Sequence, residues 1–482
     1  MKTKHLRLVY SSFLIILFSY TLPTSAQIDE MSITSNSESA KDSFLKGRYF
    51  YEAGNHSSAK MYFEKALTND ADLAIADIYL SVIENQDYNT VVSHIEKAVS
   101  LSNKVSLGER IFINFIESRF NKNEPLQKVH LSKLLTLFPK DKRIQYLSGE
   151  FYYDHQEYDL AITYLNNTIA LDSAFAISYK LLGLCNMASD NQLSAKKSFQ
   201  KYIALLPYEP DPYNSLGEFL LEQGNYEESI AGFNEAITRD QTFTKAVLGI
   251  GHNYIYQKKF EEARDFYQRS FVISETIPEK LKALYWISTS YIHEGNIDEA
   301  LNANLLYREL AKTNLMWTDV IESYNREGLI LTETGMAEEA ISKFNNAGNI
   351  AKSANLQNST KEYYSFIANV NKCYALTYNN MLEKADIEAQ KCILMTNKRN
   401  NKNELKLLNG TLGILAYKNG DFVKAINLLK NSDMENVYNI YQMGVVYEKM
   451  GNKQRADEIY SIVKSNKRNS LQNALVRERV RD

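Results

Sequence analysis

The chain has 482 residues, of which 44% are hydrophobic and 23% are charged. These fractions are ordinary for a folded soluble protein, and the length alone would suggest several globular domains. The formal net charge is −3 and becomes −6 once the three basic residues of the first 26 are removed, which argues against nucleic acid as a partner. The 33 tyrosines are interpreted as packing residues, with an aromatic binding groove as the alternative.

The first 26 residues have the layout of a secretory signal peptide. Three basic residues open the chain, residues 8–22 are apolar, and small residues precede a cleavage point expected after Ala26. The apolar run is shorter than the roughly 20 residues that span a bilayer, although an uncleaved anchor stays open as the alternative. We therefore expect an exported protein, periplasmic or extracellular, without stable membrane insertion after cleavage. Residues 27–39 are polar and predict a flexible leader.

From residue 40 onward one phrase recurs, and residues 217–236 are its clearest copy. One position of each copy holds a small residue: Ala59, Ala161, Ala195, Ser229, Ala263, Ala300, Ala340, Ala385, Ala425 and Ala456. Another small residue stands twelve positions earlier: Gly47, Gly149, Gly183, Gly217, Gly251, Ser288, Gly328, Cys373, Gly413 and Gly444. Six copies have a glycine five positions earlier: Gly54, Gly224, Gly295, Gly335, Gly420 and Gly451. A large side chain often follows four positions later: Phe63, Leu165, Phe199, Phe233, Tyr267, Phe344, Leu429 and Tyr460.

The spacing between copies is 34 residues from Ala161 to Ala263. A period in this range is typical of a solenoid, in which stacked units share one continuous core. We interpret the small residues as allowing two helices to approach closely. The turn glycine would end the first helix with a positive φ, and the large side chain would fill the groove toward the next unit.

This phrase and its period resemble the tetratricopeptide repeat family, and Pro207 stands where that family places a repeat-ending proline. The resemblance covers roughly residues 40–470, with ten clear copies and two weaker ones around Val91 and Gln127. It implies an all-α, right-handed superhelical α-solenoid of about twelve helix-turn-helix repeats. Combined with the signal peptide, it suggests a member of the exported bacterial type.

The spacing divides the repeats into a regular array over residues 40–279 and an elongated array over residues 280–470. Longer spacing predicts longer helices or longer loops, and residues 353–360 have the composition of a loop. Residues 471–482 follow the last copy and predict a cap helix, since the ends of a solenoid need a polar outer face.

No local signature of catalysis, cofactor binding or metal binding is present, and we therefore expect a protein that is not an enzyme and uses no cofactor. The seven histidines do not have metal-ligand spacing on one helix. Cys373 and Cys392 occupy the two small-residue positions of one copy. In an exported protein they could form a disulfide, and the alternative is two buried thiols that fill space.

The first helix of each repeat is expected to line the concave surface of the superhelix. There we place Arg143, Tyr146, Glu150, Tyr153, Lys180, Leu184, Asn214, Glu218, Lys245, Leu248, His252, Tyr256 and Tyr285. This amphipathic set suits an extended peptide or a partner helix, and the alternative is a solvated face without a dedicated ligand. Some family members clamp a terminal carboxylate with lysine, asparagine and arginine. Leu184 and Gly249 stand where the asparagine and arginine would be needed, so this ligand is not carried over.

Our leading hypothesis is a non-catalytic, exported binding scaffold that holds a peptide or protein partner in its concave groove. The alternative is a structural subunit of a cell-envelope assembly that uses lateral or convex interfaces. A sensor module is disfavoured because no effector segment follows the repeats.

Overall fold

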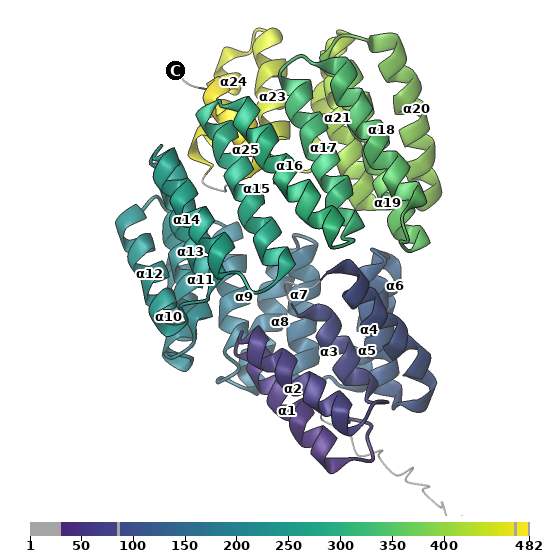
Figure 1. The fold of residues 1–482 in the computed structure, drawn as a ribbon, viewed down its shortest axis with the longest axis vertical. Coiled ribbons are helices and arrows are strands. Elements are labelled where there is room, and N and C mark those ends of the chain that lie inside the picture. Colours follow the sequence, from purple (N-terminus) through teal and green to yellow (C-terminus); the bar gives the residue numbers. More distant parts are fainter. Residues whose placement is uncertain (1–29, 84–86, 467–469, 481–482) are drawn as a thin grey trace, which may run out of the picture.

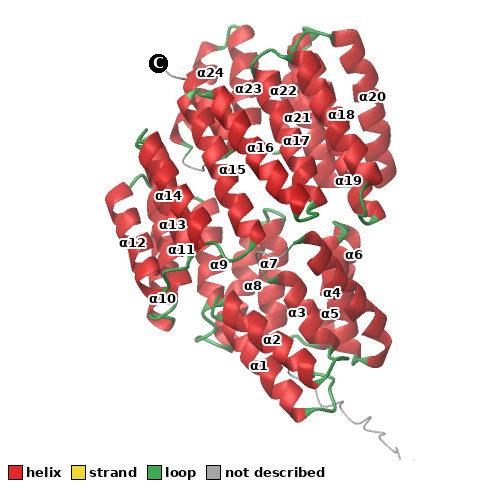
Figure 2. Cartoon of the chain, viewed as in Figure 1, coloured by secondary structure: helices red, strands yellow, loops and turns green. Residues whose placement is uncertain are grey.

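The computed structural model describes residues 30–83, 87–466 and 470–480, and these residues form helices and connecting loops without any strand (Figure 2). Among the described residues, twenty-four helices form twelve consecutive pairs, α1–α2 to α23–α24, and the two helices of each pair pack against each other. The expected all-α solenoid of about twelve helix pairs is therefore confirmed.

The first seven pairs have helices of nine to fifteen residues. Their bounds are α1 Glu38–Glu52, α2 His56–Asn69, α3 Ala74–Val82, α4 Tyr88–Leu101, α5 Leu107–Phe120, α6 Glu124–Leu137, α7 Lys142–Asp154, α8 Tyr158–Leu171, α9 Ile177–Ala188, α10 Gln192–Leu205, α11 Pro210–Glu222, α12 Tyr226–Arg239, α13 Thr244–Tyr256 and α14 Phe260–Ile273. A short 3-10 helix, η1 (Ser102–Lys104), follows α4.

From α15 onward the helices are mostly longer, up to 21 residues in α19. Their bounds are α15 Ile277–Glu294, α16 Ile297–Thr313, α17 Trp317–Glu333, α18 Ala337–Ser353, α19 Asn358–Tyr378, α20 Leu382–Arg399, α21 Lys402–Lys418, α22 Phe422–Lys430, α23 Val437–Lys449, α24 Lys453–Ser465, α25 Leu471–Val476 and the 3-10 helix η2 Arg477–Val480. The wider spacing in the sequence thus corresponds to longer helices. The predicted loop over residues 353–360 is shorter than expected, because α19 already begins at Asn358.

The turn between the helices of a pair depends on one residue with a left-handed backbone. All six turn glycines have φ between 77° and 85°, for example Gly224 at 79°. Where a copy lacks the glycine, Lys122, Gln156, Asp190, Lys258 or Asn380 adopts the same conformation. Glycine reaches this region without a Cβ clash, so the sequence-based assignment of these turns is confirmed.

The two helices of a pair approach each other at a glycine covered by an aromatic ring. A Cβ atom placed on Gly217 would lie 2.9 Å from the Phe233 ring, and one on Gly183 would lie 2.6 Å from the Phe199 ring. Real Cβ atoms essentially never approach so closely, so a side chain at Gly217 or Gly183 would force the ring above it to shift. The large side chain was expected to fill the groove toward the next unit. Phe233 covers its own Gly217 and also reaches Gly249 of the next pair, where a Cβ would lie 2.4 Å away.

Small polar side chains reinforce the same helix contact. Ser229 Oγ donates to the carbonyl oxygen of Gly217 at 2.7 Å, and Ser288 Oγ donates to that of Ala300 at 2.7 Å. Cys373 Sγ lies 3.5 Å from the carbonyl oxygen of Ala385 in the equivalent place. Ser229 is therefore a packing residue bonded across the pair.

The three cysteines are buried free thiols, so the structure contains no bond between Cys373 and Cys392. Burial raises the pKa of both thiols to about 12, which keeps them protonated and unreactive at neutral pH.

Thiol titration checks this assignment. Denatured protein that has never been reduced should give three free thiols per chain, because Cys185, Cys373 and Cys392 are all unpaired. A value of one thiol would restore the disulfide hypothesis.

The segment before α1 is held against the first repeats. The Met31 amide donates to Asp141 Oδ2 at 2.9 Å, and the Thr34 amide donates to Glu109 Oε1 at 2.9 Å. Thr34 Oγ1 accepts from the Ser106 amide at 3.0 Å. Residues 30–37 therefore differ from the flexible leader expected there. The signal peptide, its cleavage point and residues 27–29 lie outside the described residues.

The winding of the pairs brings early and late repeats together. In Figure 1 the purple and blue pairs α1–α6 lie below the green pairs α17–α21. Tyr88 OH on α4 hydrogen-bonds Thr360 Oγ1 on α19 at 2.9 Å and accepts from the Gln357 amide at 3.2 Å. Ser359 Oγ donates to Asn121 Oδ1 at 3.1 Å. The second and third pairs thus contact the tenth, which encloses the concave side.

Two glycine substitutions test the helix contact. Gly217→Ala should lower the free energy of unfolding by about 1–3 kcal/mol, because its Cβ would overlap the fully buried Phe233 ring. Gly348→Ala is the matched control inside α18: its Cβ would meet only Ala368 at 3.5 Å, and the better helix former should stabilise by up to about 1 kcal/mol. Thermal or urea unfolding measures the free energy of unfolding of both variants. Equal changes in the two variants would contradict the close helix contact at Gly217.

Candidate protein-binding groove

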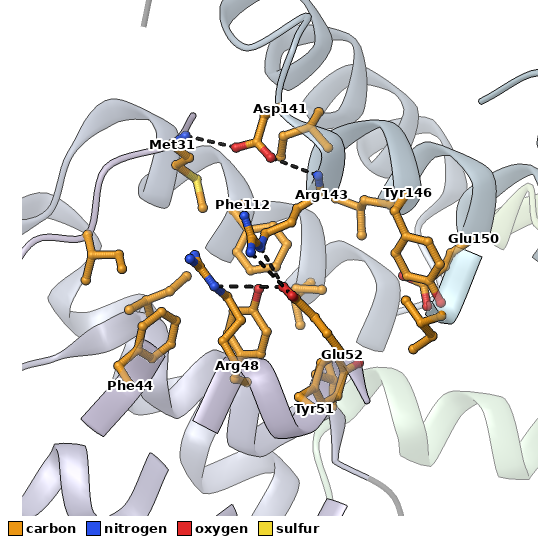
Figure 3. Close-up of a pocket in the computed structure, with 18 of the residues that line it drawn as sticks. Met31, Phe44, Arg48, Tyr51, Glu52, Phe112, Asp141, Arg143, Tyr146 and Glu150 are labelled. Carbon is orange, nitrogen blue, oxygen red and sulfur yellow. Dashed lines mark hydrogen bonds and ion pairs between the residues drawn. The ribbon is translucent and has the colours of Figure 1, made fainter. Parts of the chain in front are cut away.

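The first helices α1, α3, α5 and α7 line a pocket in the first array (Figure 3). Its apolar part includes Phe44, Tyr79 and Phe112, and its polar part includes Arg48, Glu52 and Arg143. Met31 and Ile33 from the segment before α1 also line it. The open space is only about 70 Å³, room for about two water molecules, whereas sites for whole small molecules measure about 300–1,000 Å³. The pocket therefore suits a side chain or a chain segment.

Charged side chains in this pocket are fixed by mutual ion pairs. Arg143 Nε donates to Glu52 Oε1 at 2.5 Å and Arg143 Nη2 to Glu52 Oε2 at 3.3 Å, a two-point contact. Arg48 Nε lies 3.8 Å from Glu52 (Figure 3). Arg143 Nη1 also donates to Glu30 at 3.4 Å. These contacts join α7 to α1 and to the segment before it, so the wall is rigid.

The far side of the pocket carries groups whose pKa is raised by burial. Burial raises the pKa of Tyr79 to about 12 and raises the pKa of Tyr146 well above its usual range. Burial also raises the pKa of Glu150, against the opposing charge of Arg119. Tyrosine hydroxyls that stay protonated can donate and accept hydrogen bonds, so this wall can form hydrogen bonds with the polar groups of a bound chain.

Lys180 and Lys245, both expected in the groove, are organised around a carboxylate that sequence reasoning missed. Lys180 Nζ lies 2.7 Å from Asp211 Oδ2, and Tyr202 OH donates to the same oxygen at 2.9 Å. Burial disfavours ionisation of Asp211, but the charges of Lys180 and Lys245 and these hydrogen bonds outweigh it and lower its pKa to about 2. Asp211 thus holds the position that a ligand carboxylate would need, which agrees with leaving that ligand out.

Asn214 and Glu218 form a local pair on α11. Asn214 is 2% exposed, and its Nδ2 donates to Glu218 Oε1 at 3.0 Å, while Glu218 is exposed. Only Glu218 of these two therefore faces solvent on the groove side.

Tyr153 lies near a contact between the fourth pair and the loop that follows α22, rather than in the pocket of Figure 3. Its ring is 5.8 Å from that of Tyr158, whose hydroxyl donates to Glu435 at 2.9 Å. Glu435 belongs to the loop between α22 and α23. Tyr153, Leu184 and Glu435 line one shared pocket of the described chain.

His252, Tyr256 and Tyr285 form a separate aromatic region. His252 Nδ1 hydrogen-bonds Tyr267 OH at 2.8 Å, and burial lowers the pKa of His252 to about 3, so the imidazole is neutral at physiological pH. The Tyr256 ring lies 4.6 Å from the Arg477 guanidinium, and Tyr285 OH accepts from the Leu471 amide at 3.3 Å. Two predicted groove residues therefore contact a late segment of the same chain.

The sequence also pointed to residues that were not singled out. Phe44 and Arg48 stand at the same offsets from Gly47 as Tyr146 and Glu150 from Gly149. Applying the same offsets to the first three pairs would have predicted that Phe44 and Arg48 on α1 line the pocket. Asp211 has no such signal, because its role depends on Lys180 in the preceding pair.

Among the described residues no group of three or more histidine, cysteine, aspartate or glutamate side chains could hold a metal ion. Over the same residues no helix combines the length and the apolar character needed to cross a bilayer.

Comparison with protein families finds tetratricopeptide repeats in three parts of the chain, at residues 43–73, 210–243 and 438–470. These segments correspond to the pairs α1–α2, α11–α12 and α23–α24. The chain thus contains tetratricopeptide repeats near its beginning, middle and end, in the register expected from the sequence.

One similar protein is anaphase-promoting complex subunit 3 of Schizosaccharomyces pombe, 27% identical over 120 residues. That match covers 25% of this chain and 18% of the relative, so the chain spans less than a fifth of the relative's length. Among solved structures, MamA covers 34% of this chain and 95% of its own at 20% identity and a TM-score of 0.28. The Cut9–Hcn1 hetero-tetramer of the APC/C covers 87% of this chain and 75% of its own at 14% identity and a TM-score of 0.39.

The pKa of Asp211 gives a prediction about pH. The pKa is about 2 in the folded chain and about 3.9 when unfolded, so ionised Asp211 adds about 2–3 kcal/mol above pH 4, and this is lost as the pH falls toward 2. Asp211→Asn should therefore flatten the loss of thermal stability between pH 4 and pH 2.

Asp159→Asn on α8 is the matched control, because Asp159 is exposed. It should leave the pH profile unchanged. An Asp211→Asn profile parallel to that of the parent protein would contradict the ion cluster.

Proposed function

We propose that this chain is a non-catalytic, exported scaffold that holds a peptide or protein segment in the concave groove of its first array. The observation that carries the proposal is the binding of residues 31–34 there. Their main-chain amides donate to Asp141 and Glu109, two carboxylates carried by the repeats. Side chains on this surface thus already capture a non-helical segment by its main chain.

The mechanism is recognition by a preformed surface. The ion pair between Arg143 and Glu52 fixes the groove wall before a partner arrives, so little ordering entropy remains to be lost on binding. Tyr146 and Tyr79 supply aromatic area and hydroxyl groups, and a few such anchors set the affinity. The proposed ligand is a protein segment, and no cofactor, metal or nucleic acid takes part.

A second candidate is a structural subunit of a cell-envelope assembly. The observation that favours it is a set of exposed apolar side chains on second helices, which do not line the groove. Leu193 on α10 is 67% exposed, Val272 on α14 is 71% exposed, and Val423 on α22 is 76% exposed. Lateral packing of another protein would bury these side chains.

Export belongs to this proposal and rests on the layout of the first 26 residues. The exported protein should begin at Gln27. Intact mass or N-terminal sequencing of protein recovered outside the cytoplasm would show this, whereas a chain that still begins near Met1 would contradict it.

Site-specific photocrosslinking in the native envelope separates the two functions. A photoreactive amino acid at Tyr146 should give a discrete adduct with a partner, because Tyr146 lines the groove. The same group at Leu193 is the control on a second helix. An adduct from Leu193 alone would contradict the groove and support the assembly subunit.

A further inference from the structure

The segment formed by α25 and η2, residues 471–480, packs against helices that are distant in the sequence. It lies against α15 and α23 (Figure 1), although it follows α24 along the chain. Its side chains and main chain contact Tyr256 on α13, Tyr285 on α15 and Glu333 on α17. Apart from α24, which η2 also contacts, the helices against this segment are first helices, so it lies on the concave side, mostly against the second array.

One face of the segment is apolar and buried. Leu471 and Ala474 are 5% and 4% exposed and share a cluster with Ile292 on α15 and Ile330 on α17. Val476 is fully buried in a neighbouring cluster formed largely by α23, with further residues from α21, α22 and α24. Small and aliphatic residues at helical spacing, set into a groove, are a common way for a protein to recognise a helix.

On the other face of the segment, an arginine contacts a buried carboxylate. Arg479 pairs with Glu333, whose side chain is 4% exposed. Glu333 Oε1 also accepts from Tyr438 OH at 2.8 Å and from Tyr374 OH, so α17, α19 and α23 converge on this one group. A carboxylate so deeply buried is unfavourable without a cation.

A second arginine and the main chain complete the fit. The Arg477 guanidinium lies 4.6 Å from the centre of the Tyr256 ring, a cation–π contact. The Leu471 amide donates to Tyr285 OH at 3.3 Å, and the Ser470 side chain caps α25 by accepting from the Asn473 amide. The groove thus contacts this segment at its main chain, its apolar face and both arginines.

We propose that the concave surface of the second array is a binding site for a basic amphipathic helical segment, and that residues 470–480 occupy it as an intramolecular ligand that a partner segment of the same chemistry displaces. Glu333 sets the specificity. A competitor that fills the apolar positions but brings no arginine would leave this carboxylate buried and unpaired. The inference does not depend on the proposed function, which concerns the groove of the first array.

The test uses the whole chain and a labelled synthetic peptide of residues 470–480, SLQNALVRERV. Val476→Asp with Arg479→Ala should release the resident segment, because one change buries a charge and the other removes the partner of Glu333. Fluorescence anisotropy should show that this variant binds the peptide at least about tenfold more tightly than the parent chain, in which the groove is occupied. Adding Glu333→Gln should abolish the gain.

Arg455→Ala is the matched control, since Arg455 is exposed on α24 and forms an ion pair with Glu458 of the same helix at 2.6 Å. It should leave peptide binding as weak as in the parent chain. A released variant that keeps its helical circular dichroism and binds no better than the parent chain would overturn the proposal.

Hydrogen exchange on the parent chain provides a measurement that needs no folded variant. Saturating peptide should accelerate exchange in residues 471–480 because it displaces them, and unchanged exchange would overturn the proposal. A peptide carrying Arg479→Ala should not accelerate it. Light scattering that finds a dimer, dissociated by the peptide, would make a second copy the occupant and overturn the intramolecular assignment.

Discussion

The close approach of the two helices at a glycine is the contact on which the rest of the structure depends. In the sixth pair the Phe233 ring lies directly over Gly217 and also touches Gly249 of the next pair. One side chain therefore fixes both the distance within a pair and the seating of its neighbour. Repetition of this contact turns a local packing rule into a continuous core.

This regular stacking produces the concave surfaces. The first helices α1, α3, α5 and α7 line the pocket of the first array, and the winding brings α4 against α19 through Tyr88 and Thr360. Each array then holds a segment of its own chain on the inner side: residues 31–34 in the first and residues 471–480 in the second. Carboxylates on the repeats hold both segments. Asp141 and Glu109 accept hydrogen bonds from main-chain amides of the first segment, and Glu333 pairs with an arginine of the second.

The fold could be predicted from the sequence because its signals are periodic. The 34-residue spacing identified the pairs, and the turn glycines marked the residues with positive φ. The same register placed Arg143 and Tyr146 in the groove wall. Contacts between distant segments carry no such signal: Leu471 meets Tyr285 across 186 residues, and nothing in either stretch indicates the other. For that reason the contacts of residues 30–37 with the repeats, and the docking of the predicted cap helix against α13, α15 and α17, could not be predicted.

Whether the winding encloses these surfaces is tested most directly at the contact between the third and tenth pairs. Asn121 and Ser359 are 3.1 Å apart at their side-chain oxygens, and the native cysteines are buried. In the Asn121→Cys, Ser359→Cys variant a short bismaleimide should join the two positions within one chain, as peptide mapping would show. Absence of that link, or links only between separate copies, would contradict the enclosed arrangement.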